Sequence, residues 1–139
     1  IKTLHLRVQR HCENGEKIAH FLNDHPAVDK VYWPGFTSHP NHEVAKSQMS
    51  GFGGMISFTL VGDDIEKAKR IASNTKLFAL AESLGGVESL IGHPPTMTHA
   101  SIPREERMKS GLVDSLIRLS VGVEDAEDLT ADLNHALSC

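Results

Sequence analysis

The sequence predicts an α+β domain in which a long helix precedes a small, mostly antiparallel sheet of four strands, with helices on one face of the sheet. Helical and strand patterns alternate along the 139 residues, a length that suits one domain. Alternation would also fit a parallel sheet covered on both faces, but the strands of such a sheet are apolar throughout. Here the strands expected at residues 55–61 and 116–123 each have one apolar and one mixed face, so we expect helices on one side only.

The first elements are a long helix, a short strand and a short helix. Apolar or small residues recur every three or four positions, which predicts one amphipathic helix with the stripe Leu4, Val8, Cys12, Gly15, Ile18, Ala19 and Leu22. Pro26 ends this helix. Residues 28–33 then form a strand that stops at Pro34-Gly35, and residues 39–49 form a short helix.

The remaining elements continue the alternation. The strand at residues 55–61 places apolar and polar side chains in turn. Asp63 followed by Glu66 resembles a capping box, which predicts the start of the next helix. The other elements are a strand at residues 77–81, a helix that Pro103 opens and Gly111 ends, a strand at residues 116–123, and a last helix capped by Asp125.

The composition excludes several kinds of partner. The net charge is −4 with mixed signs and no basic stripe, which argues against nucleic acid. No apolar run reaches the roughly 18 residues of a membrane span, and no signal peptide is visible, so we expect a cytoplasmic protein. Cys12 and Cys139 are too few for a disulfide framework. The chain begins at Ile1 within a helical pattern, so we expect it to be the C-terminal part of a longer protein.

Arg118 is the first candidate for a binding residue. The even positions of its strand carry Arg118, Ser120 and Gly122, so the arginine shares a face with small residues that leave room for a ligand. A guanidinium binds a carboxylate or phosphate with two parallel hydrogen bonds. The alternatives are pairing with an internal carboxylate and extension into solvent.

A second candidate is the turn Glu82-Ser83-Leu84-Gly85-Gly86, which leaves the strand at residues 77–81. Two glycines allow backbone N–H groups to approach a ligand closely, although an ordinary loop would have the same composition. Thr98 and His99 lie in a later loop and are equally compatible with a plain surface turn. Nine histidines raise the question of a metal, but only His39 and His42 approach ligand spacing and no Cys or carboxylate cluster accompanies them, so we expect no metal site.

Three runs of the sequence resemble a known enzyme family. They are LFALAESLGGVESLIGHP, MTHASIPREER and GLVDSLIRLSVGVEDAEDL, and the resemblance extends to the first helix and to GFGGMISF. Together they resemble the C-terminal domain of the Cys/Met-metabolism family of enzymes that use pyridoxal 5′-phosphate (PLP), which includes cystathionine γ-synthase, cystathionine γ- and β-lyases and methionine γ-lyase. The resemblance implies the small domain of a fold-type I PLP enzyme, similar to that of aspartate aminotransferase, over residues 1–139.

The resemblance also implies roles for five residues. Arg118 would clamp the α-carboxylate of an amino-acid substrate, with Ser83 and Leu84 helping to hold it. Glu82 would face the distal amino group of cystathionine, since an acid here is typical of cystathionine γ-synthases and γ-lyases. Thr98 would line the same pocket.

The groups that hold PLP in this family belong to a large domain that is absent from this chain. We therefore expect no catalytic or cofactor-binding residue here, no PLP binding by the chain alone, and no activity without the large domain. Ser73-Asn74-Thr75-Lys76 is superficially similar to the surroundings of a Schiff-base lysine, but we expect Lys76 to be a solvated residue at a helix end.

The resemblance predicts a transsulfuration enzyme, a cystathionine γ-synthase or γ-lyase, that carries out γ-elimination or γ-replacement at cystathionine or an activated homoserine. It also implies a homo-oligomer, a tetramer in this family. Alternatives are a cystathionine β-lyase, a methionine γ-lyase, and a separate amino-acid-binding or oligomerisation domain.

Overall fold

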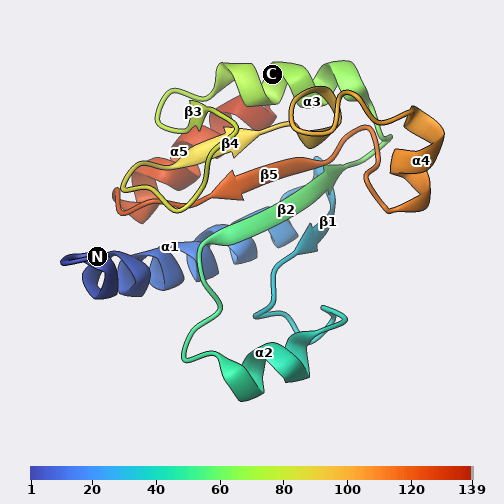
Figure 1. The fold of residues 1–139 in the computed structure, drawn as a ribbon. Helices are drawn as coiled ribbons and strands as arrows, with labels where there is room; N and C mark the ends of the chain where they lie inside the picture. Colours follow the sequence, from blue (N-terminus) through green and yellow to red (C-terminus); the bar gives the residue numbers. More distant parts are fainter. Residues whose placement is uncertain (139) are drawn as a thin grey trace.

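The computed structural model describes residues 1–138, so Cys139 lies outside the described residues. The helices are α1 (Leu4–Asp24), α2 (His42–Gln48), α3 (Ile65–Asn74), the 3₁₀ helix η1 (Pro94–Thr96), α4 (Arg104–Lys109) and α5 (Ala126–Leu137). The strands are β1 (Val28–Tyr32), β2 (Met55–Leu60), β3 (Ala79–Leu80), β4 (Leu90–Gly92) and β5 (Ile117–Ser120). Figure 1 shows their arrangement.

The strands form one sheet in the order β1-β2-β5-β4-β3. Every neighbouring pair is antiparallel except β3 with β4, which is parallel. The expectation of a mostly antiparallel α+β sheet is confirmed. The expected number of strands was wrong, because β4 is a strand of three residues that the sequence did not indicate.

The third expected strand was also too long. Residues 77–81 were expected to form it, but β3 contains only Ala79–Leu80, and both residues are exposed. Residues 76–78 are instead held by Asp132 of α5, whose carboxylate accepts hydrogen bonds from the backbone N–H groups of Lys76, Leu77 and Phe78. These bonds turn the chain toward α5 before it reaches the edge of the sheet.

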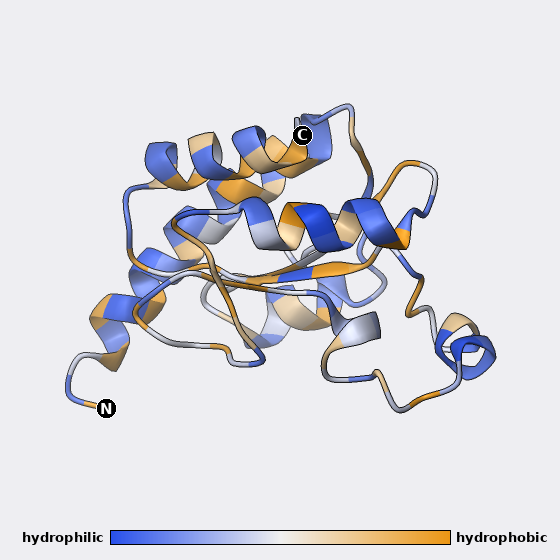
Figure 2. Ribbon diagram, turned by 90° about the horizontal axis from the view of Figure 1, so that it is seen from above, coloured by the Kyte–Doolittle hydropathy of each residue, from blue (hydrophilic) through white to orange (hydrophobic). Residues whose placement is uncertain are grey.

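Helices α1, α3 and α5 lie on one side of the sheet, as Figures 1 and 2 show and as the sequence predicted. Every second residue of the strands points toward these helices and packs against their apolar faces. The hydrophobic effect of this burial stabilises the two layers. The buried strand residues are Val31, Ile56, Phe58, Leu60, Ile91, Ile117 and Leu119, and Val121 directly after β5 is buried with them. The buried helical residues are Ile18, Ala19, Leu22, Ala68, Ile71, Ala72, Leu129, Leu133, Ala136 and Leu137. The opposite face of the sheet carries no long helix within residues 1–138.

Helix α1 follows the predicted bounds, but only its second half is covered. Ile18, Ala19 and Leu22 are fully buried, whereas Leu4 and Val8 of the predicted stripe are exposed. Burial begins at His11 and Asn14, and at Gly15 the packing is so close that a Cβ atom would lie 2.5 Å from the carbonyl oxygen of Gly53. The predicted apolar stripe is therefore longer than the part of the helix that packs against the rest of this domain.

Helix α3 begins one residue later than the predicted capping box. The carboxylate of Asp64, not Asp63, accepts hydrogen bonds from the backbone N–H groups of Glu66 and Lys67. Asp63 adopts a left-handed conformation with φ of 48° and accepts a hydrogen bond from the N–H of Ser115. At α5 the predicted cap is confirmed, since Asp125 accepts from the N–H groups of Glu127 and Asp128.

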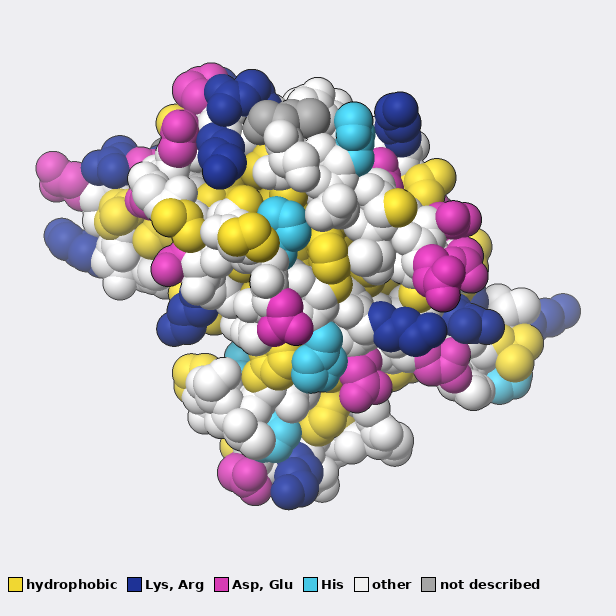
Figure 3. All heavy atoms as spheres, turned by 180° about the vertical axis from the view of Figure 1, so that it is seen from behind, with side chains coloured by type: hydrophobic (Ala, Val, Ile, Leu, Met, Phe, Trp, Pro, Cys, Tyr) yellow, Lys and Arg dark blue, Asp and Glu magenta, His cyan; other side chains and the backbone are white. Residues whose placement is uncertain are grey.

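The surface on the helical side mixes both signs of charge, as Figure 3 shows. The short helix α2 stands away from the sheet on an aromatic cluster formed by Trp33, Phe36 and Phe52. None of the helices within residues 1–138 is long and apolar enough to cross a membrane.

Candidate functional site

Arg118 lies on β5 and faces the side of the sheet opposite the helices. In the register of the sheet its neighbours are Ser57 on β2 and Gly92 on β4. Both residues are small, so the space beside the guanidinium is not filled by neighbouring strand side chains. The alternation that puts Ile117 and Leu119 into the core therefore puts Arg118 on the open face, as the sequence predicted.

Arg118 is half-buried, and its guanidinium makes no ion pair or side-chain hydrogen bond with any residue from 1 to 138. Pairing with an internal carboxylate, one alternative reading of this arginine, is thus not observed. A half-buried cation without a counter-charge favours binding of an anion, because a charge taken partly out of water needs compensation.

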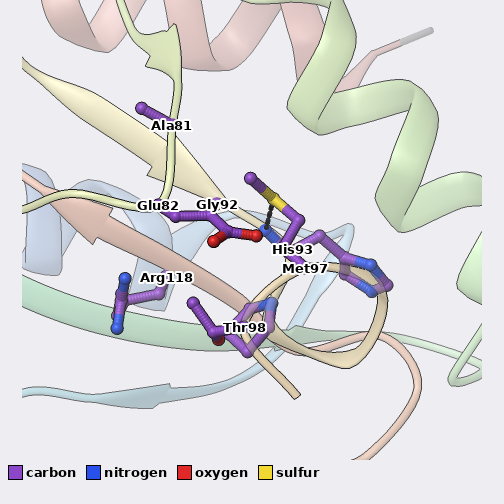
Figure 4. A pocket seen from close by; sticks show the side chains of 8 residues that line it. Ala81, Glu82, Gly92, His93, Met97, Thr98 and Arg118 are labelled. Atoms are coloured by element: carbon purple, nitrogen blue, oxygen red, sulfur yellow. Dashed lines mark hydrogen bonds between the residues drawn. The ribbon is translucent and has the colours of Figure 1, made fainter. Parts of the chain in front are cut away.

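Arg118 forms one wall of a small cleft, which we call the Arg118 cleft (Figure 4). The other residues that line it come from the end of β3, the end of β4 and the turn that follows β4: Ala81, Glu82, Gly92, His93, Pro94, Met97 and Thr98. Figure 4 shows the side chains of Glu82 and Thr98 extending into the space between Arg118 and Met97. A cationic group, a carboxylate and a hydroxyl thus border one cleft, a combination suited to a zwitterionic small molecule.

Three of the five predicted site residues meet in this cleft: Arg118, Glu82 and Thr98. Glu82 is exposed and has no ion-pair partner within residues 1–138. The Thr98 hydroxyl lies 2.7 Å from Nδ1 of His99. Ser83 and Leu84 do not line the cleft; both are exposed and continue the chain beyond Glu82 along its rim.

The loop that carries Glu82 is fastened to β5 and the residues after it. Gly85 adopts a φ of 72°, which suits glycine, and its N–H donates to the Ser120 hydroxyl. At the other end of the loop, the N–H and hydroxyl of Ser89 both donate to the Glu124 carboxylate, at 2.6 and 2.8 Å. The loop also passes close to the backbone of Gly122, where an added Cβ atom would lie 2.4 Å from the carbonyl oxygen of Val87.

Five residues of the cleft were not among the predicted site residues: Ala81, Gly92, His93, Pro94 and Met97. Gly92 ends the unpredicted strand β4, and His93, Pro94 and Met97 follow it. The run Leu90-Ile91-Gly92-His93-Pro94-Pro95 is too short, and too interrupted by glycine and proline, to be predicted as a strand. The sequence held one signal for this part of the site: His93 stands between Gly92 and two prolines, which are not the polar neighbours of an ordinary surface histidine.

His93 is buried, and its pKa lies below the usual value for histidine. Burial is the main cause of this lowered pKa, and the positive charge of Arg107 adds to it, while the hydrogen bond to the Asp114 carbonyl and the Asp114 carboxylate oppose it. The imidazole is therefore neutral near neutral pH.

The described residues 1–138 contain no group of three or more His, Cys, Asp or Glu side chains placed to hold a metal ion. His42, one of the two histidines with ligand-like spacing, is instead bonded through Nδ1 to the carbonyl oxygen of Pro34 at 2.8 Å.

Comparison with known proteins assigns the family. The model for "Cys/Met metabolism PLP-dependent enzyme" matches residues 1–138. The chain belongs to this family. Cystathionine gamma-lyase of Dictyostelium discoideum is 56% identical over 137 residues, which are 99% of this chain and 35% of that protein.

Relatives with other names match the same share of the chain at 50–59% identity. Cystathionine beta-lyase of Lactococcus lactis subsp. cremoris (strain MG1363) is 59% identical over 99% of this chain and 36% of that protein. L-methionine gamma-lyase of Fusobacterium nucleatum subsp. polymorphum is 50% identical over 99% of this chain and 34% of that protein. The chain thus spans about a third of the length of these relatives.

The residues of the Arg118 cleft do not fit PLP by themselves. Covalent attachment of PLP needs a lysine amine, and no lysine is among the residues that line the cleft. Lys76 is exposed between α3 and β3, and its backbone N–H is bound by Asp132. The cleft can hold an anionic group through Arg118, but it offers no anchor for the cofactor.

Proposed function

We propose that this chain is the substrate-binding, C-terminal part of a PLP-dependent transsulfuration enzyme, in which Arg118 binds the α-carboxylate of the amino-acid substrate. The observation that carries this proposal is the position of Arg118: half-buried, next to Gly92, and without a counter-charge within residues 1–138. A carboxylate that enters the cleft would supply this counter-charge with two parallel hydrogen bonds.

We further propose that PLP is held by a large domain outside this chain, and that the open face of the sheet presents Arg118 to it. The absence of a lysine from the cleft residues supports this division. PLP supplies the electron sink for bond cleavage at the amino acid, while the residues of this chain bind and orient the substrate. The homotetramer and the cytoplasmic location remain predictions, and sedimentation of the complete enzyme tests the former.

Glu82 favours cystathionine as the substrate over methionine. Its free carboxylate borders the cleft that Arg118 also lines, so an amino acid bound through its α-carboxylate could extend its far end toward Glu82. Cystathionine carries a second ammonium group there and methionine carries none. A β-lyase or a γ-lyase acting on cystathionine is compatible with this arrangement, and a methionine γ-lyase is the second candidate because a relative of that name is 50% identical.

Steady-state kinetics of the complete enzyme test the role of Arg118. Arg118→Lys keeps the charge but loses the planar pair of donors, so kcat/KM for cystathionine should fall by roughly 10- to 150-fold, mainly through KM. Arg70→Lys, an exposed position of α3 away from the cleft, is the matched control and should leave the kinetics unchanged. Unchanged kinetics in Arg118→Lys would remove this arginine from the site.

A further inference from the structure

His93 occupies the point where pairing between β4 and β5 stops. The last pair of this ladder is Gly92 with Arg118. Beyond it come Pro94 and Pro95, which have no N–H group and cannot extend the ladder. The turn that carries Met97 and Thr98 into the cleft therefore has to be held to the β5 side by other means.

The imidazole of His93 supplies this connection. Its Nε2 atom lies 2.7 Å from the backbone carbonyl oxygen of Asp114, and because a carbonyl only accepts hydrogen bonds, Nε2 carries the hydrogen. Nδ1 is then the bare nitrogen and accepts a hydrogen bond from the Thr96 hydroxyl at 2.8 Å. Both ring nitrogens are satisfied, and the residue is 2% exposed, so the ring has one orientation and one tautomer.

His93 joins the turn that lines one side of the cleft to the chain segment that leads to Arg118 on the other side. On one side, the His93 N–H donates to Met97 Sδ at 3.2 Å, and the His93 carbonyl accepts from the N–H groups of Thr96 and Met97. On the other side, Asp114 lies four residues before Arg118 in the chain that leads into β5. Figure 4 shows the ring of His93 pointing away from Arg118 while its backbone lines the cleft.

Asp114 is itself fixed. Its carboxylate accepts a hydrogen bond from Arg104 Nε at 2.6 Å and lies 3.4 Å from both terminal nitrogens of the Arg107 guanidinium. The carbonyl to which His93 donates therefore belongs to an anchored backbone segment.

We propose that His93 is a positioning residue for the candidate substrate site: its neutral ring holds the Met97–Thr98 side of the cleft at a set distance from Arg118. It touches neither substrate nor cofactor in this assignment and acts through the turn it holds. The assignment rests on the proposed function, because it concerns the site that Arg118 defines.

Two variants of the complete enzyme test this role. His93→Phe keeps an aromatic ring of similar size but removes both hydrogen bonds, so KM for the amino-acid substrate should rise roughly 5- to 50-fold with a smaller change in kcat. His93→Gln places an amide N–H near the position of Nε2 and can still donate to the Asp114 carbonyl, so it should recover most of the wild-type KM. A loss of packing alone would not be rescued selectively by glutamine, which packs less well than phenylalanine.

A third variant avoids any disturbance of the buried ring. Thr96 is exposed, and Thr96→Val removes only the hydroxyl that holds Nδ1. In the 139-residue chain, ¹⁵N NMR of His93 should report the Nε2–H tautomer both in wild type and in Thr96→Val, because the Asp114 carbonyl still accepts from Nε2, while the Nδ1 resonance should shift on loss of the hydroxyl donor.

The outcomes separate the two proposals. A raised KM in His93→Phe with recovery in His93→Gln supports the positioning role, whatever Arg118→Lys shows. A wild-type KM in His93→Phe, or an Nδ1–H tautomer in the wild-type chain, overturns it. The result for Arg118→Lys decides the proposed function separately, because that variant leaves the contacts of His93 intact.

Discussion

Gly92 and Arg118 are directly paired residues of β4 and β5, so a residue without a side chain lies next to the one arginine of the cleft. A Cβ atom at Gly92 would lie 3.2 Å from the Ala81 carbonyl oxygen and 3.9 Å from Met97 Sδ. A side chain at position 92 would therefore crowd the Ala81 and Met97 walls of the cleft.

Filling the cleft at position 92 should weaken substrate binding in the complete enzyme. We expect Gly92→Ala to raise KM by about 10-fold, because a methyl group there displaces the ligand or pushes the cleft residues apart. Gly86→Ala is the matched control, since a Cβ atom there would meet only the flexible end of the Glu88 side chain. Equal KM values for the two variants would show that the ligand lies elsewhere.

Glu82 should control which substrate is used. We expect Glu82→Gln in the complete enzyme to lower the ratio of kcat/KM for cystathionine to that for methionine by about one order of magnitude, because only cystathionine offers a distal ammonium group. Glu88→Gln changes an exposed acid of the same loop that does not line the cleft, and it should leave the ratio unchanged. If both substrates lose activity equally in Glu82→Gln, the residue has a structural role.

The 139-residue chain should not form a Schiff base with PLP. None of the residues lining the cleft is a lysine, and Lys76 is solvent-exposed. Titration with PLP and visible spectroscopy should give no stoichiometric absorbance band in wild type. A stoichiometric band that disappears in Lys76→Ala would contradict this expectation.

Asp132 should contribute measurably to stability. Its buried carboxylate accepts three backbone hydrogen bonds, whereas an asparagine amide offers a single acceptor oxygen. We expect Asp132→Asn to lower the free energy of unfolding of the chain by about 1–3 kcal/mol in urea denaturation. The control is Asp128→Asn, an exposed change on the same helix, which should lower the free energy of unfolding by less than about 1 kcal/mol. Equal decreases in the two variants would show that the three hydrogen bonds contribute little to stability.

His93 should make the chain less stable in mild acid. Its folded-state pKa is lowered, chiefly by burial, so below the unfolded value of about 6.5 the unfolded chain binds a proton that the folded chain does not. The contribution of the neutral His93 ring to the free energy of unfolding is therefore fully present above about pH 6.5 and is lost as the pH falls toward the folded-state pKa. Urea denaturation between about pH 7.5 and pH 5 should show a smaller loss of stability in His93→Gln than in wild type; parallel pH profiles would argue against a buried neutral imidazole.

Much of the sheet and its single helical layer follows from local patterns. The two-residue alternation at Ile117 and Leu119 also assigns Arg118 to the open face without any knowledge of the fold. The convergence of Glu82 and Thr98 on Arg118 does not follow from such patterns. It depends on the parallel pairing of two-residue β3 with three-residue β4, and strands this short give too few alternations to be detected.

Local patterns also fail to place the ends of helices and the extent of their packing. Asp63 and Asp64 are both good capping residues, and the choice between them depends on the Ser115 N–H that Asp63 binds across the fold. The exposed Leu4 and Val8 satisfy the helical period without contacting the core. Periodicity reports which face of a helix is apolar, and it does not report how far the covering layer extends.

The loop from Glu82 to Ser89 is fixed at its Ser89 end and exposed at its Glu82 end. The Ser89 end is held by the contacts among Ser89, Gly122 and Glu124, whereas Glu82, Ser83 and Leu84 at the other end are exposed. Under the proposed role of Glu82, substitutions among these three residues change substrate preference with little penalty to folding. For directed evolution, a library confined to these three codons samples selectivity while leaving the scaffold intact.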